Sequence, residues 1–385
     1  MDDALGRARA LFERFDEQLR GELPAGADIV DAHVHLGNDI DGMAGTYEEL
    51  ESILDRYGIA QAFMFCMDEH DREPAFRAPN DRSLAAAERS AGRLIPFVRL
   101  DLNGPDPIDE ATRCLDRGAR GIKLHPRAQR FQLNDARLDP VFALAAERRL
   151  PILIHGGRGL PPIADHLAHL MDRYPGARLI VAHAGIADLA GLAGHFAGRP
   201  DVYFDTSVWS PVDLLDLFRL VSPEQVLYAS DYPYGQQPAS LLIALRTARL
   251  SGLDERRLRA MLGGTARSVV AGEPTPDLTG PTGADTFSQP MTFARIHQYL
   301  SMATPLLWTR QADTIGVLGL ALNTCYERRD GHSEETDEIK ELLLVAHDLW
   351  RALVDMEDEG ERNVAARTTF RLVHLADIIA VTTGG

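Results

Sequence analysis

Eight short apolar runs, each five to eight residues long, divide the first 233 residues of the chain. Stretches with a helical pattern, such as 84–90 and 140–149, lie between most of them. Apolar runs that alternate with helices are typical of parallel βαβ units. Eight such units predict an α/β fold of the (β/α)8 TIM-barrel type. A doubly wound sheet is the alternative, but none of the runs precedes the GxGxxG loop that often accompanies that fold. The runs are 29–33, 60–67, 94–100, 121–125, 151–155, 178–183, 202–206 and 226–230.

The pattern changes after residue 272, where a segment rich in proline and glycine begins. From about 289 onward no strand pattern occurs, and apolar positions such as Ile339, Leu342 and Ala346 recur at the helical spacing of three and four. We expect one helix to begin near Ser333, another to cover 364–379, and one or two more to lie within 291–328. The predicted organisation is an N-terminal helical lead (1–27), a barrel (28–272), a linker (273–288) and an all-helical domain of unknown role (289–385).

Charge and composition narrow the classes of partner. The chain carries 40 Lys and Arg against 57 Asp and Glu, a net charge of −17, so most of its surface should repel nucleic acid. Its three cysteines are far apart, and no apolar stretch approaches the ~18 residues that a membrane span needs. The charged N-terminus does not resemble a signal peptide. We therefore expect a cytoplasmic protein with a small-molecule substrate and no nucleic-acid or membrane partner.

Histidines gather at the ends of the predicted strands. His33 and His35 are two apart, so on a strand their side chains point to the same face. His155 and His183 end two later runs, and Asp231 directly follows a third. In a TIM barrel the carboxyl ends of the strands surround one mouth, where active sites lie. Histidines and a carboxylate in one ring predict a site for a divalent metal such as Zn²⁺.

Several short motifs resemble those of the amidohydrolase superfamily, in particular its amidohydrolase-related (amidohydrolase-2) branch. The resemblance covers about 28–272 and does not reach the helical domain. It implies a metal-dependent enzyme on a TIM barrel, and it says little about the substrate. The motifs are Asp-Ala-His-Val-His-Leu-Gly (31–37), Gly-Ile-Lys-Leu-His-Pro (121–126), Ile-His-Gly-Gly (154–157), Val-Ala-His-Ala-Gly (181–185), Phe-Asp-Thr-Ser (204–207) and Ser-Asp-Tyr-Pro (230–233).

The resemblance also implies roles for individual residues. It makes His33, His35, His155 and Asp231 the metal ligands. His183 would hold the attacking water or the substrate carbonyl, or would ligate a second metal. Asp231 would also act as the general base, because a carboxylate beside a metal-activated water can take its proton. Asp231 and His183 are thus the expected catalytic residues.

Lys123 is one of only two lysines in the chain, and it lies on the fourth predicted strand. In some relatives a carboxylated lysine there bridges two metals. We expect one metal ion per chain, or two if Lys123 is carboxylated. Lys123 could instead bind a substrate carboxylate, and His125, two residues on, faces the same way.

Other residues are weaker candidates. Arg99 and Arg158 are positioned to clamp a substrate carboxylate, although a solvated or ion-paired arginine is equally expected. Asp205 could orient a ligand histidine or cap a turn. Trp209 and Tyr234 could line the substrate pocket or simply pack.

Three functions remain open. The first is a hydrolase that cleaves a lactone, amide or ester of a small organic acid with metal-activated water. The second is a metal-dependent non-oxidative decarboxylase of an aromatic or unsaturated acid, which needs proton delivery to carbon and not a water nucleophile. The third is a barrel that serves only as a binding module or scaffold. For the helical domain we expect dimerisation into a homo-oligomer, capping of the barrel mouth, or docking of a partner.

Overall fold

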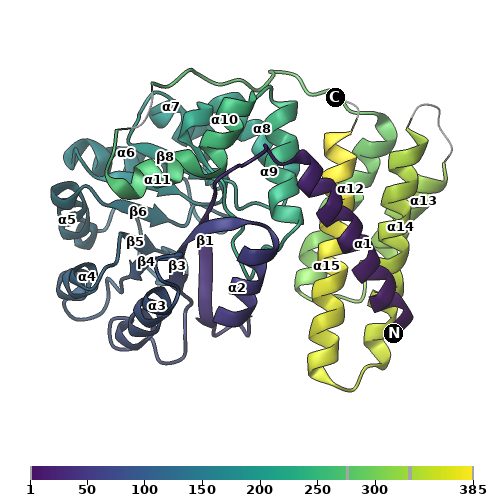
Figure 1. Ribbon diagram of the computed structural model, residues 1–385, viewed down its shortest axis with the longest axis horizontal. Coiled ribbons are helices and arrows are strands. Elements are labelled where there is room, and N and C mark those ends of the chain that lie inside the picture. The colour runs from purple at the N-terminus through teal and green to yellow at the C-terminus, as the bar shows by residue number, and fades with distance from the viewer. Residues whose placement is uncertain (1, 275–276, 328–331, 384–385) are drawn as a thin grey trace.

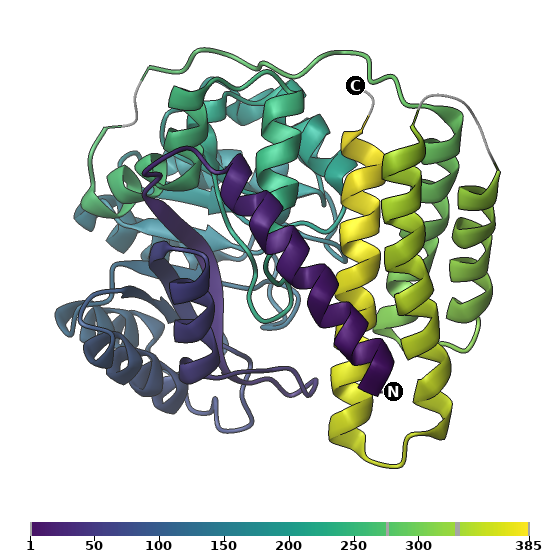
Figure 2. The same ribbon diagram turned by 45° about the vertical axis from the view of Figure 1, so that its right-hand side comes forward.

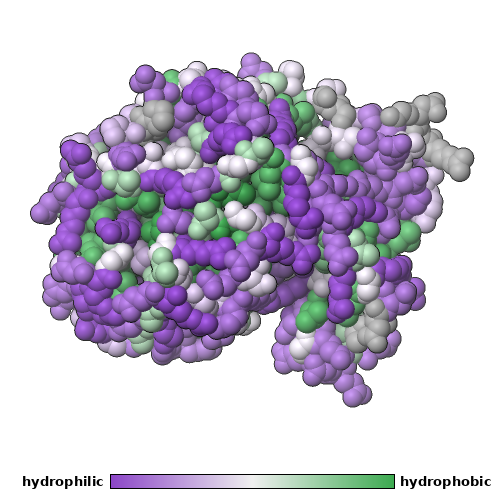
Figure 3. Space-filling model, in the orientation of Figure 1, coloured by the Kyte–Doolittle hydropathy of each residue, from purple (hydrophilic) through white to green (hydrophobic). Residues whose placement is uncertain are grey.

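The computed structural model describes residues 2–274, 277–327 and 332–383. A barrel of strands surrounded by helices lies beside a bundle of long helices, and residues 277–290 cross one side of the barrel to reach the bundle (Figures 1 and 2). Hydrophilic residues cover most of the face seen in Figure 3. Among the described residues, no helix is long and apolar enough to cross a membrane.

Nine strands of the described chain form one sheet in the order β2-β1-β3-β4-β5-β6-β7-β8-β9. All neighbouring strands are parallel except β2, a two-residue strand that pairs antiparallel with the end of β1. The eight parallel strands coincide with the eight apolar runs, so the barrel prediction is confirmed. The strands are β1 (Ile29–Asn38), β2 (Ala44–Gly45), β3 (Ile59–Cys66), β4 (Leu94–Arg99), β5 (Gly121–Leu124), β6 (Pro151–Ile154), β7 (Arg178–Val181), β8 (Val202–Asp205) and β9 (Val226–Leu227).

The segment after β9 closes the sheet into a barrel. The backbone N–H of Ala32 donates to Tyr228 O at 2.9 Å, that of Asp231 to His33 O at 2.9 Å, and that of His35 to Tyr232 O at 2.7 Å. The first parallel strand, β1, is therefore hydrogen-bonded to the segment that follows the last one, β9. The sheet closes into a barrel with no free edge between them.

Helices cover the outside of the barrel (Figure 1). The strands are apolar on both sides because one side fills the barrel and the other packs under these helices. Leu153 and Ile180 belong to the inner cluster, whereas Ile152 and Val181 belong to the cluster beneath the helices. The helices are α2 (Tyr47–Arg56), α3 (Arg77–Arg89), α4 (Pro107–Asp116), α5 (Asp139–Arg148), α6 (Ala164–Arg173), α7 (Leu189–Phe196), α8 (Pro211–Leu220), α9 (Ala239–Leu250), α10 (Glu255–Arg259) and α11 (Thr265–Ala271).

The helical domain contains four long helices in its described part, and their apolar faces pack into one core with residues such as Ile296, Leu342 and Leu372. The helix expected from Ser333 and the one expected over 364–379 both form, and two more occupy the stretch from 291 to 326. They are α12 (Met291–Trp308), α13 (Thr314–Tyr326), α14 (Ser333–Ala352) and α15 (Glu359–Thr382).

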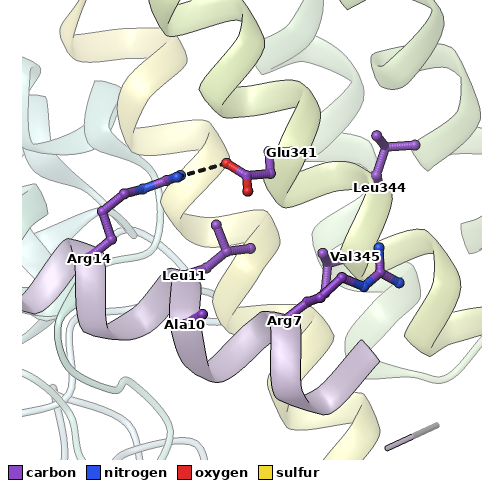
Figure 4. A pocket seen from close by; sticks show the side chains of 7 residues that line it. All are labelled: Arg7, Ala10, Leu11, Arg14, Glu341, Leu344 and Val345. Atoms are coloured by element: carbon purple, nitrogen blue, oxygen red, sulfur yellow. Dashed lines mark hydrogen bonds and ion pairs between the residues drawn. The ribbon is translucent and has the colours of Figure 1, made fainter. Parts of the chain in front are cut away.

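The N-terminal helix α1 (Asp2–Glu22) packs against this bundle and crosses its face (Figure 2). Phe15 and Leu19 of α1 are completely buried. Arg14 pairs with Glu341 of α14 at 2.7 Å, beside a pocket between the two helices (Figure 4). The N-terminal lead is thus a further helix of the bundle, although the whole barrel separates it from the others in sequence.

The proline- and glycine-rich segment lies along the barrel in its described part, which leaves out residues 275 and 276. Thr279 donates from Oγ1 to Glu224 Oε1 at 2.9 Å, and Gly283 N–H donates to Phe218 O at 2.9 Å. A Cβ at Gly283 would lie 2.6 Å from Arg219 N, so only glycine fits this close approach. The segment is therefore fastened to α8 and to the loop before β9.

Candidate metal centre

A bulge in β1 turns the two histidines of the first motif into the barrel. The pairing of β1 with β3 shifts its register between Asp31 and Val34. Ala32 belongs to the inner cluster, but Val34 belongs to the outer one. A bulge puts an extra residue into the strand, so the inward positions after it are odd-numbered. His33 and His35 accordingly lie against the inner ring of Phe65, with ring centroids 5.0 and 4.6 Å away.

Three potential ligand atoms then form a small triangle at the barrel mouth. His33 Nε2 lies 3.2 Å from His35 Nε2, and Asp231 Oδ1 lies 3.3 Å from each of these nitrogens. Four ligands arranged tetrahedrally at about 2.0–2.1 Å from a zinc ion lie about 3.3–3.4 Å from one another. The triangle thus has the dimensions of one face of a tetrahedral site.

The backbone at two of the site residues is left-handed. Asp231 has φ 61° and His183 has φ 58°, values that are uncommon for residues other than glycine. Alternation along β7 would direct His183 outward, because Ile180 and Ala182 face inward. The left-handed conformation ends this alternation and lets His183 face the centre. Ligand atoms of His33, His183 and Asp231 all lie within 4.8 Å of one another.

Asp205, at the end of β8, holds two of the histidines. Its Oδ2 accepts a hydrogen bond from His33 Nδ1 at 2.7 Å, and its Oδ1 accepts from the backbone N–H of His183 at 2.8 Å. Asp205 and His33 are both fully buried. A carboxylate that accepts from Nδ1 keeps the proton on that nitrogen, so the Nε2 lone pair of His33 points to the triangle. This contact agrees with the orienting role considered for Asp205.

Ser207 fixes the state of His183 in the same way. His183 Nδ1 lies 2.8 Å from the backbone oxygen of Ser207, and a carbonyl oxygen can only accept. His183 therefore donates from Nδ1 and presents an unprotonated Nε2. Burial lowers the pKa of His183, which also favours the neutral ring. In this state Nε2 can ligate a metal or accept a proton, but it cannot donate a hydrogen bond to a carbonyl.

His155 lies next to this group and stacks on His125. The ring centroids of His155 and His125 are 3.9 Å apart at an angle of 13°, and those of His155 and His183 are 4.7 Å apart. A Cβ at Gly157 would come within 2.9 Å of both His155 and His183, so glycine permits their approach. Within the described chain, His155 Nε2 is buried and has no hydrogen-bond partner. A buried nitrogen left free in this way is suited to a ligand or a metal.

Lys123 projects into the centre of the site from β5. Its Nζ lies 3.3 Å from His33 Nε2 and 4.5 Å from the centroid of Phe65. Burial lowers the pKa of Lys123 to about 7, although Asp231 and Asp205 favour its charged form. Burial also raises the pKa of Asp231 well above its usual range, an effect that Lys123 opposes. The amine and the carboxylate thus both titrate far from their ordinary pH ranges, as is typical of functional sites.

The two arginine candidates differ in position. Arg99 is buried on β4, where Nη1 donates to Cys66 O at 3.3 Å and the guanidinium lies 4.7 Å from the centroid of the Phe76 ring. In the described structure its Nε and Nη2 have no hydrogen-bond partner. Arg158 is exposed in the loop after β6. The structure therefore brings Arg99 toward the centre and leaves Arg158 outside the cluster.

The donor set fits a divalent ion. Imidazole nitrogens and carboxylate oxygens are the ligands that zinc, manganese and related ions use. Two of the histidines present unprotonated nitrogens because neighbouring acceptors hold their other protons. A family model described as amidohydrolase (Amidohydro_2) matches residues 30–271, more than half of the chain.

The chain belongs to the amidohydrolase family.

Solved structures resemble the fold of this amidohydrolase. A protein from Staphylococcus aureus described as an amidohydrolase is 16% identical with a TM-score of 0.52, and the match covers 63% of this chain and 99% of that one. A structure described as amidohydrolase II is 20% identical with a TM-score of 0.51, covering 63% and 100%. The 5-carboxyvanillate decarboxylase of Novosphingobium aromaticivorans, with bound manganese, is 17% identical with a TM-score of 0.49, covering 64% and 97%. The family match ends before the helical domain.

Two residues of this amidohydrolase site were not singled out from the sequence. Asp31 is buried, and its Oδ1 accepts from the backbone N–H groups of His33 at 3.2 Å and Ser230 at 2.9 Å. It thereby joins β1 to the closing segment, and burial raises its pKa to about 7. Ser207 orients His183. Asp31 is part of the Asp-Ala-His-Val-His-Leu-Gly motif (31–37), and that motif was the signal that could have identified it.

Proposed function

We propose that the chain is a metal-dependent hydrolase that cleaves a lactone, amide or ester bond of a small organic acid. The observation that carries this proposal is the triangle of His33, His35 and Asp231, whose edges of 3.2–3.3 Å match those of a tetrahedral zinc site. We further propose zinc, one ion per chain, in a cytoplasmic enzyme. A bound divalent ion would polarise the scissile carbonyl and make water a better nucleophile.

The residues around the triangle have separate tasks. Asp231 is the proposed general base, because its carboxylate lies in the triangle, beside any water that a bound ion would activate. His183 presents an unprotonated Nε2, so we assign it to ligation or to accepting a proton from water. His155 is the further proposed ligand, since its free Nε2 is buried among these groups in the described chain.

Two buried basic side chains favour an acidic substrate. Arg99 keeps two N–H-bearing nitrogens without partners in the described structure, and Lys123 lies beside His33. These groups could hold a carboxylate next to the metal. The same arrangement supports the second candidate function, non-oxidative decarboxylation of an aromatic or unsaturated acid, in which Asp231 would deliver the proton to carbon.

The decisive experiment measures metal content and activity on one sample. Purified enzyme is analysed for divalent metals and assayed against lactones, anilides, esters and hydroxybenzoic acids. We expect about one equivalent of metal, hydrolysis by the wild type, and loss of activity in Asp231→Asn. Asp201→Asn, a change of the same kind at a partly exposed carboxylate before β8, is the matched control. Release of CO₂ with no hydrolysis would establish the decarboxylase, and metal-free protein without activity would refute both.

A further inference from the structure

The helical domain and the barrel enclose a cleft of about 400 Å³ next to the candidate metal centre. We call it the interdomain cleft. Its barrel side consists of the β1–β2 turn and the segment after β9, which includes Tyr234. Its other side consists of the end of α12 and one face of α15. The barrel alone would therefore leave this space open on one side.

Aromatic rings line the helical side and its contact with the barrel. Trp308 of α12 lies 6.1 Å from Tyr234 and 6.0 Å from Phe370 of α15, measured between ring centroids. Trp209, from the loop after β8, lies 5.1 Å from both Trp308 and Phe370. Trp308 remains 40% exposed within this cluster. An indole that is fixed by neighbouring rings and still exposed offers a surface for a flat ligand.

Three arginines border the same cleft, and none of them forms an ion pair with a carboxylate of the described chain. Arg367 of α15 donates to Met43 Sδ at 3.1 Å, and Arg310 donates to the amide oxygen of Asn363. Arg371 donates to Gln237 O at 2.7 Å. Asp41 supplies the one carboxylate of the lining, so the cleft carries an excess of positive charge in a chain whose net charge is −17.

Tyr234 connects the cleft with the candidate metal centre. Its ring lies 5.7 Å from His35 on one side and 6.1 Å from Trp308 on the other. Its hydroxyl donates to Asp39 Oδ2 at 3.0 Å, which holds the ring in this position. The cleft therefore lies one aromatic ring away from the candidate metal centre.

We propose that the interdomain cleft binds the part of the substrate remote from the reacting bond, and that this part is an aromatic ring bearing a carboxylate. The ring packs on Trp308, and the carboxylate pairs with Arg367 and Arg310, whose guanidinium groups can each donate two hydrogen bonds to it. The helical domain thereby determines substrate specificity. The assignment to a substrate rests on the proposed function, whereas ring and carboxylate binding can be measured without turnover.

The test uses the full-length protein and two probes of the same shape, 4-nitrobenzoate and 4-nitrobenzamide. Affinities are measured by titration calorimetry, and reduced quenching of tryptophan fluorescence in Trp308→Phe, compared with the wild type, locates the bound nitroaromatic ring. We expect the wild type to bind the benzoate, with the neutral amide about tenfold weaker. Arg367→Gln should weaken benzoate binding by about tenfold. Trp308→Ala should weaken both probes, and Trp308→Phe should restore part of the affinity.

Arg362→Gln is the matched control, because Arg362 lies on the same helix and is exposed outside the cleft. It should bind as the wild type does. Melting temperatures of all variants show whether each one is folded, and the Trp308→Phe variant tests the ring contact if Trp308→Ala is not. Unchanged benzoate affinity in folded Arg367→Gln, equal binding of the two probes, or no binding by the wild type would overturn the proposal.

The results distinguish the proposal for the cleft from the proposal for the reaction. Benzoate binding that depends on Arg367, in protein that hydrolyses nothing, would support the cleft and refute the hydrolase. Hydrolysis of simple lactones, with a benzoate affinity that is unchanged in Arg367→Gln, would support the hydrolase and refute the cleft.

Discussion

Asp205 offers the sharpest test of how the candidate metal centre is built. Its carboxylate accepts from His33 Nδ1 at 2.7 Å and so leaves Nε2 free to ligate. In Asp205→Asn, the amide oxygen can still accept from the backbone N–H of His183, which would direct the amide NH₂ toward His33. An NH₂ group donates, so His33 would have to accept at Nδ1 and carry its proton on Nε2. That tautomer cannot bind a metal through Nε2.

The expected loss follows from the burial of both partners. His33 and Asp205 are fully buried, so water cannot replace the lost hydrogen bond. Loss of an outer hydrogen-bond partner costs about 10- to 100-fold in metal affinity, or about 1.4–2.7 kcal/mol. We expect Asp205→Asn to bind zinc weaker by that factor, and its activity to recover partly when zinc is added in excess.

The assay is competition for zinc with a chromophoric chelator of known affinity. Asp201→Asn is the control, because it makes the same change at a partly exposed carboxylate that pairs with Arg199 and contacts none of the site histidines. It should change zinc affinity far less than Asp205→Asn does. Equal zinc affinity in the wild type and Asp205→Asn would mean that His33 does not depend on Asp205 for its tautomer, and the reasoning would fail.

Three further predictions concern metal number, pH and the N-terminal helix. Lys123→Met should still bind one equivalent of zinc; two equivalents in the wild type and one in the variant would instead establish a second, lysine-dependent metal. Burial lowers the pKa of His374 to about 4, so the folded state stays neutral while the unfolded state takes up a proton below about pH 6.5. Stability is therefore lost as the pH falls, by about 2 kcal/mol from this residue at about pH 5. In denaturant titrations at about pH 8 and pH 5, the stability of His374→Gln should not show this part of the loss. Phe15→Ala should destabilise the bundle by about 3–5 kcal/mol in the same assay, because Phe15 is completely buried, whereas exposed Glu13→Ala should have little effect.

The barrel could be predicted because parallel strands buried on both sides leave a strong signal in the sequence. Each strand is a nearly continuous apolar run, and Ile152, Leu153 and Ile154 are all fully buried in the structure. Residues that follow such runs lie at one end of the barrel, so the strand ends indicated the site as well. Lys123 and His155 face inward by simple alternation, as expected.

The details of the site depended on departures from regular strands, which have no clear signal in one sequence. His33 and His35 share a face, as predicted, but the bulge between Asp31 and Val34 makes that face the inner one. His183 faces the centre because its backbone is left-handed. Both departures are local conformations that tertiary packing selects, so the periodicity of apolar residues does not reveal them.

The packing between the barrel and the helical domain could not be predicted from the sequence, for a different reason. The interdomain cleft unites Met43, Tyr234, Trp308 and Arg367, which lie far apart in the chain. No motif or period connects them, because the contact depends on how α12 and α15 pack on the barrel. The sequence indicated that this domain is helical and which face of a helix is apolar. It did not indicate which surface that face would pack against.

The distribution of positive charge joins the two parts of the proposal. A chain with a net charge of −17 repels anions over most of its surface, so an acidic substrate needs cations that are not already paired. Lys123 and Arg99 lie inside the barrel, whereas Arg310 and Arg367 lie in the cleft, and Tyr234 stands between the two groups. Water screens the cleft arginines but hardly reaches Lys123. The cleft is therefore suited to attract and orient an anion, and the buried pair to hold charge at the reacting end.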